Sequence, residues 1–255
     1  MAADMVSHER AWAPPPSRPE LGEDEVHVWR AYLSQTEAAR RKLYAMLSED
    51  ERARAARFHF AADRESFVVG RGAQRDILGR YLGAEPAAIR FDYSRYGKPS
   101  LAGPHHGALQ FNVSNSHRVA LYAVARSRRL GVDVELLNAR HAGEEIAERF
   151  FSAAEVSSLR GLAPGARTAG FFNCWTRKEA YIKALGEGLS HPLHSFAVSL
   201  APGSPAALLW ADGDPSEPAR WTFRELFPGP LYAAAVAVEG PPPTFRLWHW
   251  DAGQP

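Results

Sequence analysis

Two acidic residues alternate with valines in the segment GVDVE (131–135), and this spacing places two carboxylates together. In a β-strand the two valines face one side of the sheet, while Asp133 and Glu135 face the other. Adjacent like charges raise each other's pKa unless a cation relieves them, and a hard divalent ion such as Mg²⁺ prefers oxygen ligands. The segment therefore indicates either a Mg²⁺ site or the solvated outer face of an antiparallel strand.

A third carboxylate lies in a helical segment further along the chain, FFNCWTRKEAYIKAL (171–185). Trp175 and Ile182 mark its apolar face, and Glu179 falls between them on that face. An inward-facing carboxylate must be protonated, paired or metal-bound, because burying it alone is costly. Lys183 follows Glu179 by one turn, so the alternative is an ordinary i,i+4 pair at the helix surface.

Two turns carry groups that suit anionic oxygens. Lys98 stands between glycine and proline in YGKP (96–99), and Ser114 and Asn115 lie in FNVSNS (111–116) at the end of a strand. Ammonium, hydroxyl and amide groups all donate hydrogen bonds to phosphate. Each segment alone is also typical of an ordinary loop.

Hydrophobic patterning predicts the elements that must position these groups. Strands are expected at 26–33, 89–93, 109–113, 119–125, 130–136 and within 196–250, and helices within 35–60, 63–82, 144–151, 152–159 and 168–185. We expect 119–125 and 130–136 to pair as a hairpin. Three arginines of the helix at 63–82 could add phosphate contacts, but in so arginine-rich a chain they are interpreted as a solvated face, namely Arg64, Arg71 and Arg75.

Composition excludes several classes of protein. The 255 residues carry a formal net charge of +1 with 45% hydrophobic and 23% charged residues, which argues against a broadly basic nucleic-acid-binding protein. A single cysteine, Cys174, forms no intramolecular disulfide, so a reducing compartment, the cytoplasm, is expected. No apolar stretch is long enough to span a bilayer, and residues 1–10 lack a signal-peptide pattern. We therefore expect no membrane association.

Five segments, taken in order, resemble the Sfp-type 4'-phosphopantetheinyl transferase superfamily over about residues 25–240. They are YGKP (96–99), FNVSNS (111–116), GVDVE (131–135), RFFSAAE (149–155) and WTRKEAYIKALGEGL (175–189). The resemblance implies a holo-[acyl-carrier-protein] synthase type of activity. Such an enzyme is Mg²⁺-dependent and moves the phosphopantetheine arm of coenzyme A to a serine of an acyl or peptidyl carrier protein, with release of adenosine 3',5'-bisphosphate.

The resemblance also assigns expected roles to the acidic residues. Asp133, Glu135 and Glu179 stand where the family's metal-coordinating carboxylates stand. Glu179, Glu135 and Lys183 are the expected catalytic residues. The proton of the carrier serine is taken either by Glu179 or by a metal-bound water activated by Glu135, and the sequence does not choose between them.

For coenzyme A, the resemblance points to Lys98, Lys183, Ser114 and Asn115. The two lysines match positions that contact its phosphates, and Ser114 matches the serine of a Ser-His pair. Here Asn115 stands in place of that histidine, with His117 two residues later. Because an amide carries no positive charge, we expect weaker discrimination between coenzyme A and its 3'-dephospho form.

The expected architecture is α+β, with two similar, pseudo-twofold-related subdomains and the active site between them. The resemblance supports this division, and so does the similarity of the sequences LYAVA (121–125) and LYAAAVA (231–237). The boundaries are a proline-rich mobile arm at 1–22, an N-terminal subdomain at 23–125 and a C-terminal subdomain at 126–255. A monomer is expected. Two alternatives stay open, a Mg²⁺-dependent hydrolase of nucleotide pyrophosphates and a carrier-binding module without catalysis.

Overall fold

The computed structural model describes residues 12–138 and 142–253, and within them one order of elements occurs twice. The first run contains β1 (Glu25–Tyr32), α2 (Glu37–Met46), α3 (Glu49–Ala56), α4 (Ala61–Leu82), β2 (Phe91–Tyr93), β3 (Pro99–Leu101), β4 (Gln110–Ser116) and β5 (Val119–Ala125). The second contains β6 (Leu130–Leu136), α5 (Glu144–Phe150), α6 (Ala153–Gly161), α7 (Pro164–Leu185), β7 (Phe196–Val198), β8 (Leu208–Ala211), β9 (Trp221–Leu226) and β10 (Tyr232–Glu239). A final strand, β11 (Thr244–Trp250), follows. The predicted mixed α+β class is confirmed.

The two runs also build their main sheets alike. In the order β11-β1-β5-β4, the first strand of the run pairs antiparallel with β5, which pairs antiparallel with β4. In the order β6-β10-β9, the same roles fall to β6, β10 and β9. The predicted hairpin between 119–125 and 130–136 is wrong, because β5 already has a partner on each edge and the chain crosses to the other sheet after it.

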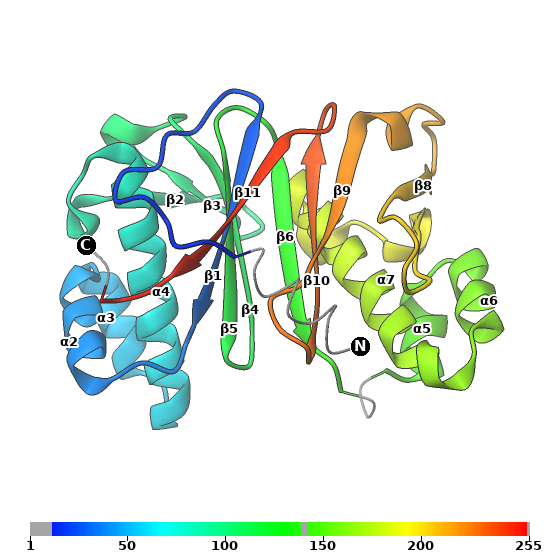
Figure 1. Cartoon of the computed structure of the whole chain (residues 1–255), viewed down its shortest axis with the longest axis horizontal. Helices are drawn as coiled ribbons and strands as arrows, with labels where there is room; N and C mark the ends of the chain where they lie inside the picture. The colour runs from blue at the N-terminus through cyan, green and yellow to red at the C-terminus, as the bar shows by residue number, and fades with distance from the viewer. Residues whose placement is uncertain (1–11, 139–141, 254–255) are drawn as a thin grey trace.

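The two sheets meet where β4 and β6 lie side by side near the centre of the molecule (Figure 1). Side chains join the two strands here. The backbone N–H of Val132 donates to Asn112 Oδ1 at 2.9 Å, and that of Leu136 donates to Ser116 Oγ at 3.1 Å. Because side chains alternate along a strand, this contact sets the serines of β4 opposite the acids of β6.

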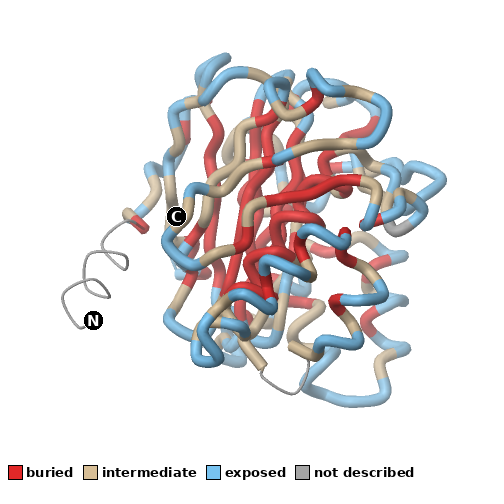
Figure 2. The backbone as a smooth tube through the Cα atoms, turned by 90° about the vertical axis from the view of Figure 1, so that its right-hand side faces the viewer, coloured by how far each residue is buried: buried red, intermediate tan, exposed pale blue. Residues whose placement is uncertain are grey.

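Two long helices cover the outer faces of the sheets, with α4 on one flank and α7 on the other (Figure 1). The buried residues concentrate in the strands and in the inner faces of these helices (Figure 2). On the α7 side the approach is very close. A Cβ added to Gly131 would lie 2.1 Å from the carbonyl oxygen of Ala180 and 2.5 Å from the nitrogen of Ala184. Only glycine fits there. Among the described helices, none has the length and apolarity to cross a membrane.

Part of the predicted arm at 1–22 packs against the fold, and residues 1–11 lie outside the described residues. Trp12 is 6% exposed, and its indole N–H donates to the carbonyl oxygen of Phe227 at 2.8 Å. Ala13 forms a bridge with Trp248 of β11, which itself runs parallel to β1. The end of the predicted C-terminal segment 126–255 thus completes the first sheet.

Candidate active site

Three predicted site residues meet where β4, β6 and α7 come together. The Lys183 Nζ lies 2.6 Å from Asp133 Oδ1 and 2.9 Å from Ser114 Oγ, and the Ser114 hydroxyl donates to the same Asp133 oxygen at 2.8 Å. Asp133 is 2% exposed, whereas a quarter of the Lys183 side chain is exposed. Burial raises the pKa of the Asp133 carboxyl, and the Lys183 ammonium opposes this effect.

The alternation predicted for β6 accounts for this arrangement. Val132 and Val134 pack between the two sheets, so Asp133 and Glu135 face α7. Glu135 lies one step further along this face, where its Oε2 accepts a hydrogen bond from Ser116 Oγ at 2.8 Å. The alternative of a solvated outer face does not hold for Asp133, since this side chain is buried.

Glu179 is half-buried on α7, one turn before Lys183. The pKa of Glu179 is raised to about 7, first by burial and then by the nearby carboxylates of Asp133 and Glu135, against the opposing effect of Lys183. The three carboxylates therefore destabilise one another's charged forms. The alternative of an ordinary surface pair with Lys183 is not what the structure has, because the Lys183 ammonium lies against Asp133.

The donor chemistry of this site fits a hard divalent cation. Within the described ranges, no three acidic, histidine or cysteine side chains stand close enough to hold a metal together as placed. However, Asp133 Oδ2 is buried and accepts no hydrogen bond from any described residue. A cation beside that oxygen would satisfy it and would relieve the repulsion with Glu135 and Glu179.

Lys98 lies apart from these side chains. Its ammonium donates to the carbonyl oxygens of Lys183 at 2.7 Å, Ala184 at 3.0 Å and Leu130 at 3.4 Å. Two of these acceptors belong to the last turn of α7, where unpaired carbonyls and the helix dipole attract a cation, and the third belongs to the start of β6. Burial lowers the pKa of Lys98 to about 8. In this structure Lys98 caps a helix, and its predicted phosphate contact stays a prediction.

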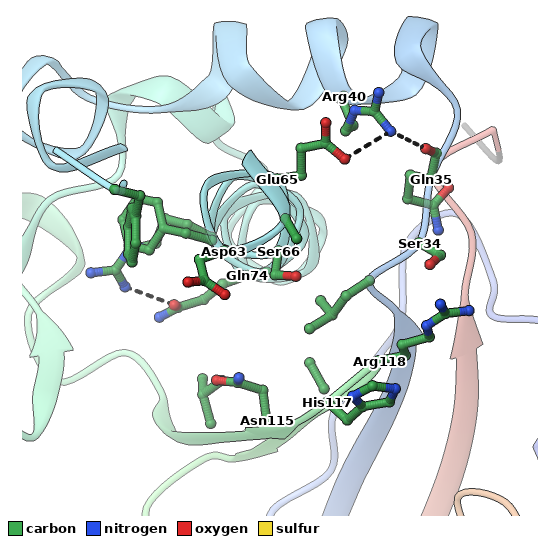
Figure 3. Close-up of a pocket in the computed structure, with 18 of the residues that line it drawn as sticks. Ser34, Gln35, Arg40, Asp63, Glu65, Ser66, Gln74, Asn115, His117 and Arg118 are labelled. Carbon is green, nitrogen blue, oxygen red and sulfur yellow. Dashed lines mark hydrogen bonds and ion pairs between the residues drawn. The ribbon is translucent and has the colours of Figure 1, made fainter. Parts of the chain in front are cut away.

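Asn115 points away from Ser114, because neighbouring residues of β4 face opposite sides. It is exposed and lines a cleft of about 1190 Å³ between β4, α4 and the turn after β1, together with His117 and Arg118 (Figure 3). His117, at the tip of the β4–β5 hairpin, has a positive φ of 52°. The structure therefore separates the predicted pair, with Ser114 at the carboxylates and Asn115 in the cleft.

Sequence reasoning considered phosphate contacts for Arg71 but did not predict the other arginines that line this cleft. Four arginines contribute to its lining, namely Arg40, Arg54, Arg71 and Arg118. The interpretation of the α4 arginines as a solvated face is wrong for Arg75, which is 2% exposed, and for Arg71, whose side chain is 11% exposed. The four arginines that line the cleft come from α2, α3, α4 and the turn between β4 and β5, so no local pattern in the sequence brings them together.

Comparison with known proteins follows the same division of the chain. Residues 129–237 match the 4'-phosphopantetheinyl transferase superfamily, and residues 29–127 match the N-terminal region of 4'-phosphopantetheinyl transferases. The 4'-phosphopantetheinyl transferase HetI of Nostoc sp. strain PCC 7120 is 42% identical over 247 residues, which cover 96% of this chain and 100% of that protein. The chain belongs to the 4'-phosphopantetheinyl transferase superfamily.

Further members of the superfamily are similar over smaller shares of the chain. The phosphopantetheinyl transferase of Thraustochytrium sp. is 30% identical over 88% of this chain and 80% of its own length. The 4'-phosphopantetheinyl transferase Sfp of Bacillus subtilis strain 168 is 34% identical over 66% of this chain and 72% of its own length. The resemblance predicted from the five motifs is thereby confirmed.

Proposed function

We propose that this chain transfers the 4'-phosphopantetheine group of coenzyme A to a serine of an acyl or peptidyl carrier protein. The observation that carries the proposal is the Ser114–Asp133–Lys183 contact beside an arginine-lined cleft, in a chain 42% identical to HetI across that protein's full length. The cleft offers cations for the phosphates of coenzyme A, and the carboxylates offer oxygen ligands for Mg²⁺.

In this proposal Asp133, Glu135 and Glu179 hold Mg²⁺. The ion, when bound, supplies positive charge at the pyrophosphate and so stabilises the departing adenosine 3',5'-bisphosphate. The orphaned Asp133 Oδ2 supports this assignment, and so does the mutual repulsion of the three carboxylates.

The chain's own residues have three tasks in the transfer. Lys183, held by Asp133 and Ser114, presents a fixed positive charge to a phosphate oxygen. Either Glu179 or a water activated by Glu135 accepts the proton of the carrier serine. Asn115, His117 and the cleft arginines orient the nucleotide end of coenzyme A.

We further propose that the two runs of elements form pseudo-twofold-related subdomains, at 23–125 and 126–255, with the site at their boundary. The repeated strand order supports this arrangement. The site draws Ser114 from the first run and Asp133 and Lys183 from the second. We expect a monomeric, cytoplasmic enzyme of the holo-[acyl-carrier-protein] synthase type, with no role for nucleic acid or membranes.

The test is incubation of the chain with Mg²⁺, coenzyme A and a panel of apo carrier proteins, followed by intact-mass measurement. We expect a phosphopantetheine adduct on at least one carrier, no adduct after chelation of Mg²⁺, and none on a carrier whose acceptor serine is replaced by alanine. Absence of an adduct on every carrier would overturn the proposal. Release of nucleotide at the same rate without a carrier would favour a hydrolase.

A further inference from the structure

The two halves of the fold share a buried anchor that joins a short helix to the long helix after it. Ser48 and Ser152 each begin a short helix, and their backbone N–H groups donate to Glu51 Oε2 at 3.0 Å and to Glu155 Oε2 at 2.8 Å. Both glutamates are almost completely buried, at 3% and 2% exposure. In each half, then, a capping glutamate is turned inward instead of facing solvent.

Each glutamate also holds a cation of the long helix. Arg75 Nε lies 2.6 Å from Glu51 Oε2, and Lys178 Nζ lies 2.8 Å from Glu155 Oε2. Each cation then donates to two backbone carbonyls of the segment after its helix. Arg75 reaches the carbonyls of Pro86 and Ile89 at 2.8 and 2.9 Å, and Lys178 those of Leu193 and Phe196 at 2.7 and 2.6 Å. The same device therefore fixes α4 and α7 against their surroundings.

The two anchors differ in what the second carboxylate oxygen holds. Four residues before Lys178 on α7 stands Cys174, whose Sγ contacts Glu155 Oε1 at 3.4 Å. Four residues before Arg75 on α4 stands Arg71, whose Nε lies 2.8 Å from Glu51 Oε1. The first half thus has a second cation at the position where the second half has a neutral thiol.

That extra cation faces the cleft. Arg71 donates through Nη1 to Gln74 Oε1 at 2.7 Å and through Nη2 to the hydroxyl of Tyr93, and all three residues line the cleft. An arginine side chain has several rotatable bonds, and a carboxylate on its Nε removes much of that freedom before a ligand arrives. Glu51 itself is not among the residues that line this cleft.

We propose that Glu51 is a positioning residue for donor binding, which acts through Arg71. It holds the Arg71 guanidinium toward the cleft, so that this cation meets a phosphate of the donor without a reordering cost. The inference rests on the proposed function, because it takes coenzyme A as the ligand of the cleft. Glu155 provides the matched comparison, since its anchor lies beside Glu179 and carries no cleft cation.

The experiment varies coenzyme A at saturating Mg²⁺ and apo carrier protein, for the full chain and for Glu51→Gln, Arg71→Met, the double variant and Glu155→Gln. We expect Glu51→Gln and Arg71→Met each to raise the KM for coenzyme A about fivefold with kcat within about twofold of the parent. The double variant should be no worse than Arg71→Met, because Glu51 acts through that residue. Glu155→Gln should leave this KM near the parent value and lower kcat.

Direct binding separates positioning from loss of structure. Calorimetric titration measures the Kd for adenosine 3',5'-bisphosphate. We expect this Kd to rise by the same factor in Glu51→Gln and in Arg71→Met. Because Arg71→Met leaves the Glu51–Arg75 pair intact, the rise in that variant does not reflect loss of that pair. An unchanged KM in Glu51→Gln, a full multiplication of the two effects in the double variant, or an equal rise of KM in Glu155→Gln would each overturn the inference. If the parent chain loads carriers, any of these results overturns the inference and leaves the proposed function standing. If the parent chain neither binds coenzyme A nor loads any carrier, both the inference and the proposed function are overturned.

Discussion

The substitution Gly131→Ala tests whether the close contact between β6 and α7 aligns the site. A Cβ at this position would lie 2.1 Å from the carbonyl oxygen of Ala180 and 2.5 Å from the nitrogen of Ala184. Ordinary contacts between such atoms need about 3.5 Å, so α7 must recede by more than about 1 Å. Rotation of a side chain does not relieve the clash, because both atoms belong to the backbone of α7.

The displacement should affect both stability and transfer. Lys183 lies on the same turn of α7, so its 2.6 Å contact with Asp133 would lengthen beyond hydrogen-bond range. Overpacking against a rigid helix should lower the free energy of unfolding by about 3 kcal/mol, and misplacement by about 1 Å should lower kcat/KM by roughly 100-fold. Urea unfolding measures the first effect, and timed intact-mass analysis of a carrier protein measures the second.

Gly165→Ala is the matched control on the same helix, since nothing stands within 4 Å of a Cβ added there. Alanine favours a helix over glycine by about 1 kcal/mol, so this variant should be as stable as the parent or more so, with parental transfer. Parental stability and kcat/KM in Gly131→Ala, or equal damage in both variants, would refute the reasoning.

Three further predictions concern single side chains. Asp133→Ala should abolish most transfer even at saturating Mg²⁺, as measured by intact mass, and normal transfer there would contradict its role as a metal ligand. Asn115→His should raise the ratio of kcat/KM for coenzyme A to that for 3'-dephospho-coenzyme A about tenfold if a charged imidazole adds one phosphate contact, and equal ratios in parent and variant would refute this. Lys98 has a pKa of about 8 in the fold, because of burial, against an ordinary value of 10.5, so above pH 8 the unfolded chain binds more protons there than the folded one. Its contribution to the free energy of unfolding should therefore rise between pH 8 and 10.5. Urea unfolding at these two pH values should show that rise in the parent and not in Lys98→Met. The same pH dependence of the unfolding free energy in both proteins would contradict the burial of this ammonium.

Much of the site was predictable because its residues follow local periodicity. The strand at 130–136 has the predicted bounds, and its alternation places Asp133 on the face toward α7. The helix predicted at 168–185 begins four residues earlier, at Pro164, and ends where predicted, before Gly186 with its positive φ of 80°. Its 3.6-residue period places Glu179 and Lys183 one turn apart, whereas the contact of Lys183 with Asp133 depends on the packing of α7 against β6. The roles of these residues in metal binding and catalysis stay predictions.

Other features depend on contacts between distant segments, which periodicity does not encode. Lys98 was expected to face a phosphate, but the end of α7 lies 85 residues away in sequence and offers its ammonium unpaired carbonyls. The partner that buries Arg75 is Glu51, on another helix, so the polar pattern of α4 alone suggested solvent. The strand at 119–125 was assigned the wrong neighbour, because pairing with β1 spans about 90 residues.

The return of β11 to the edge of β1 has a consequence for a nicked chain. The exposed turn at 126–129 separates the two runs of elements, yet the seven paired positions from Glu25–Thr244 to Ala31–Trp250 join the beginning of the fold to its end. A cut in that turn would leave two fragments that still share a parallel strand ladder. The nick would sever one covalent crossing between the halves while the fragments remained held together by backbone hydrogen bonds, so proteolysis there need not release a separate half.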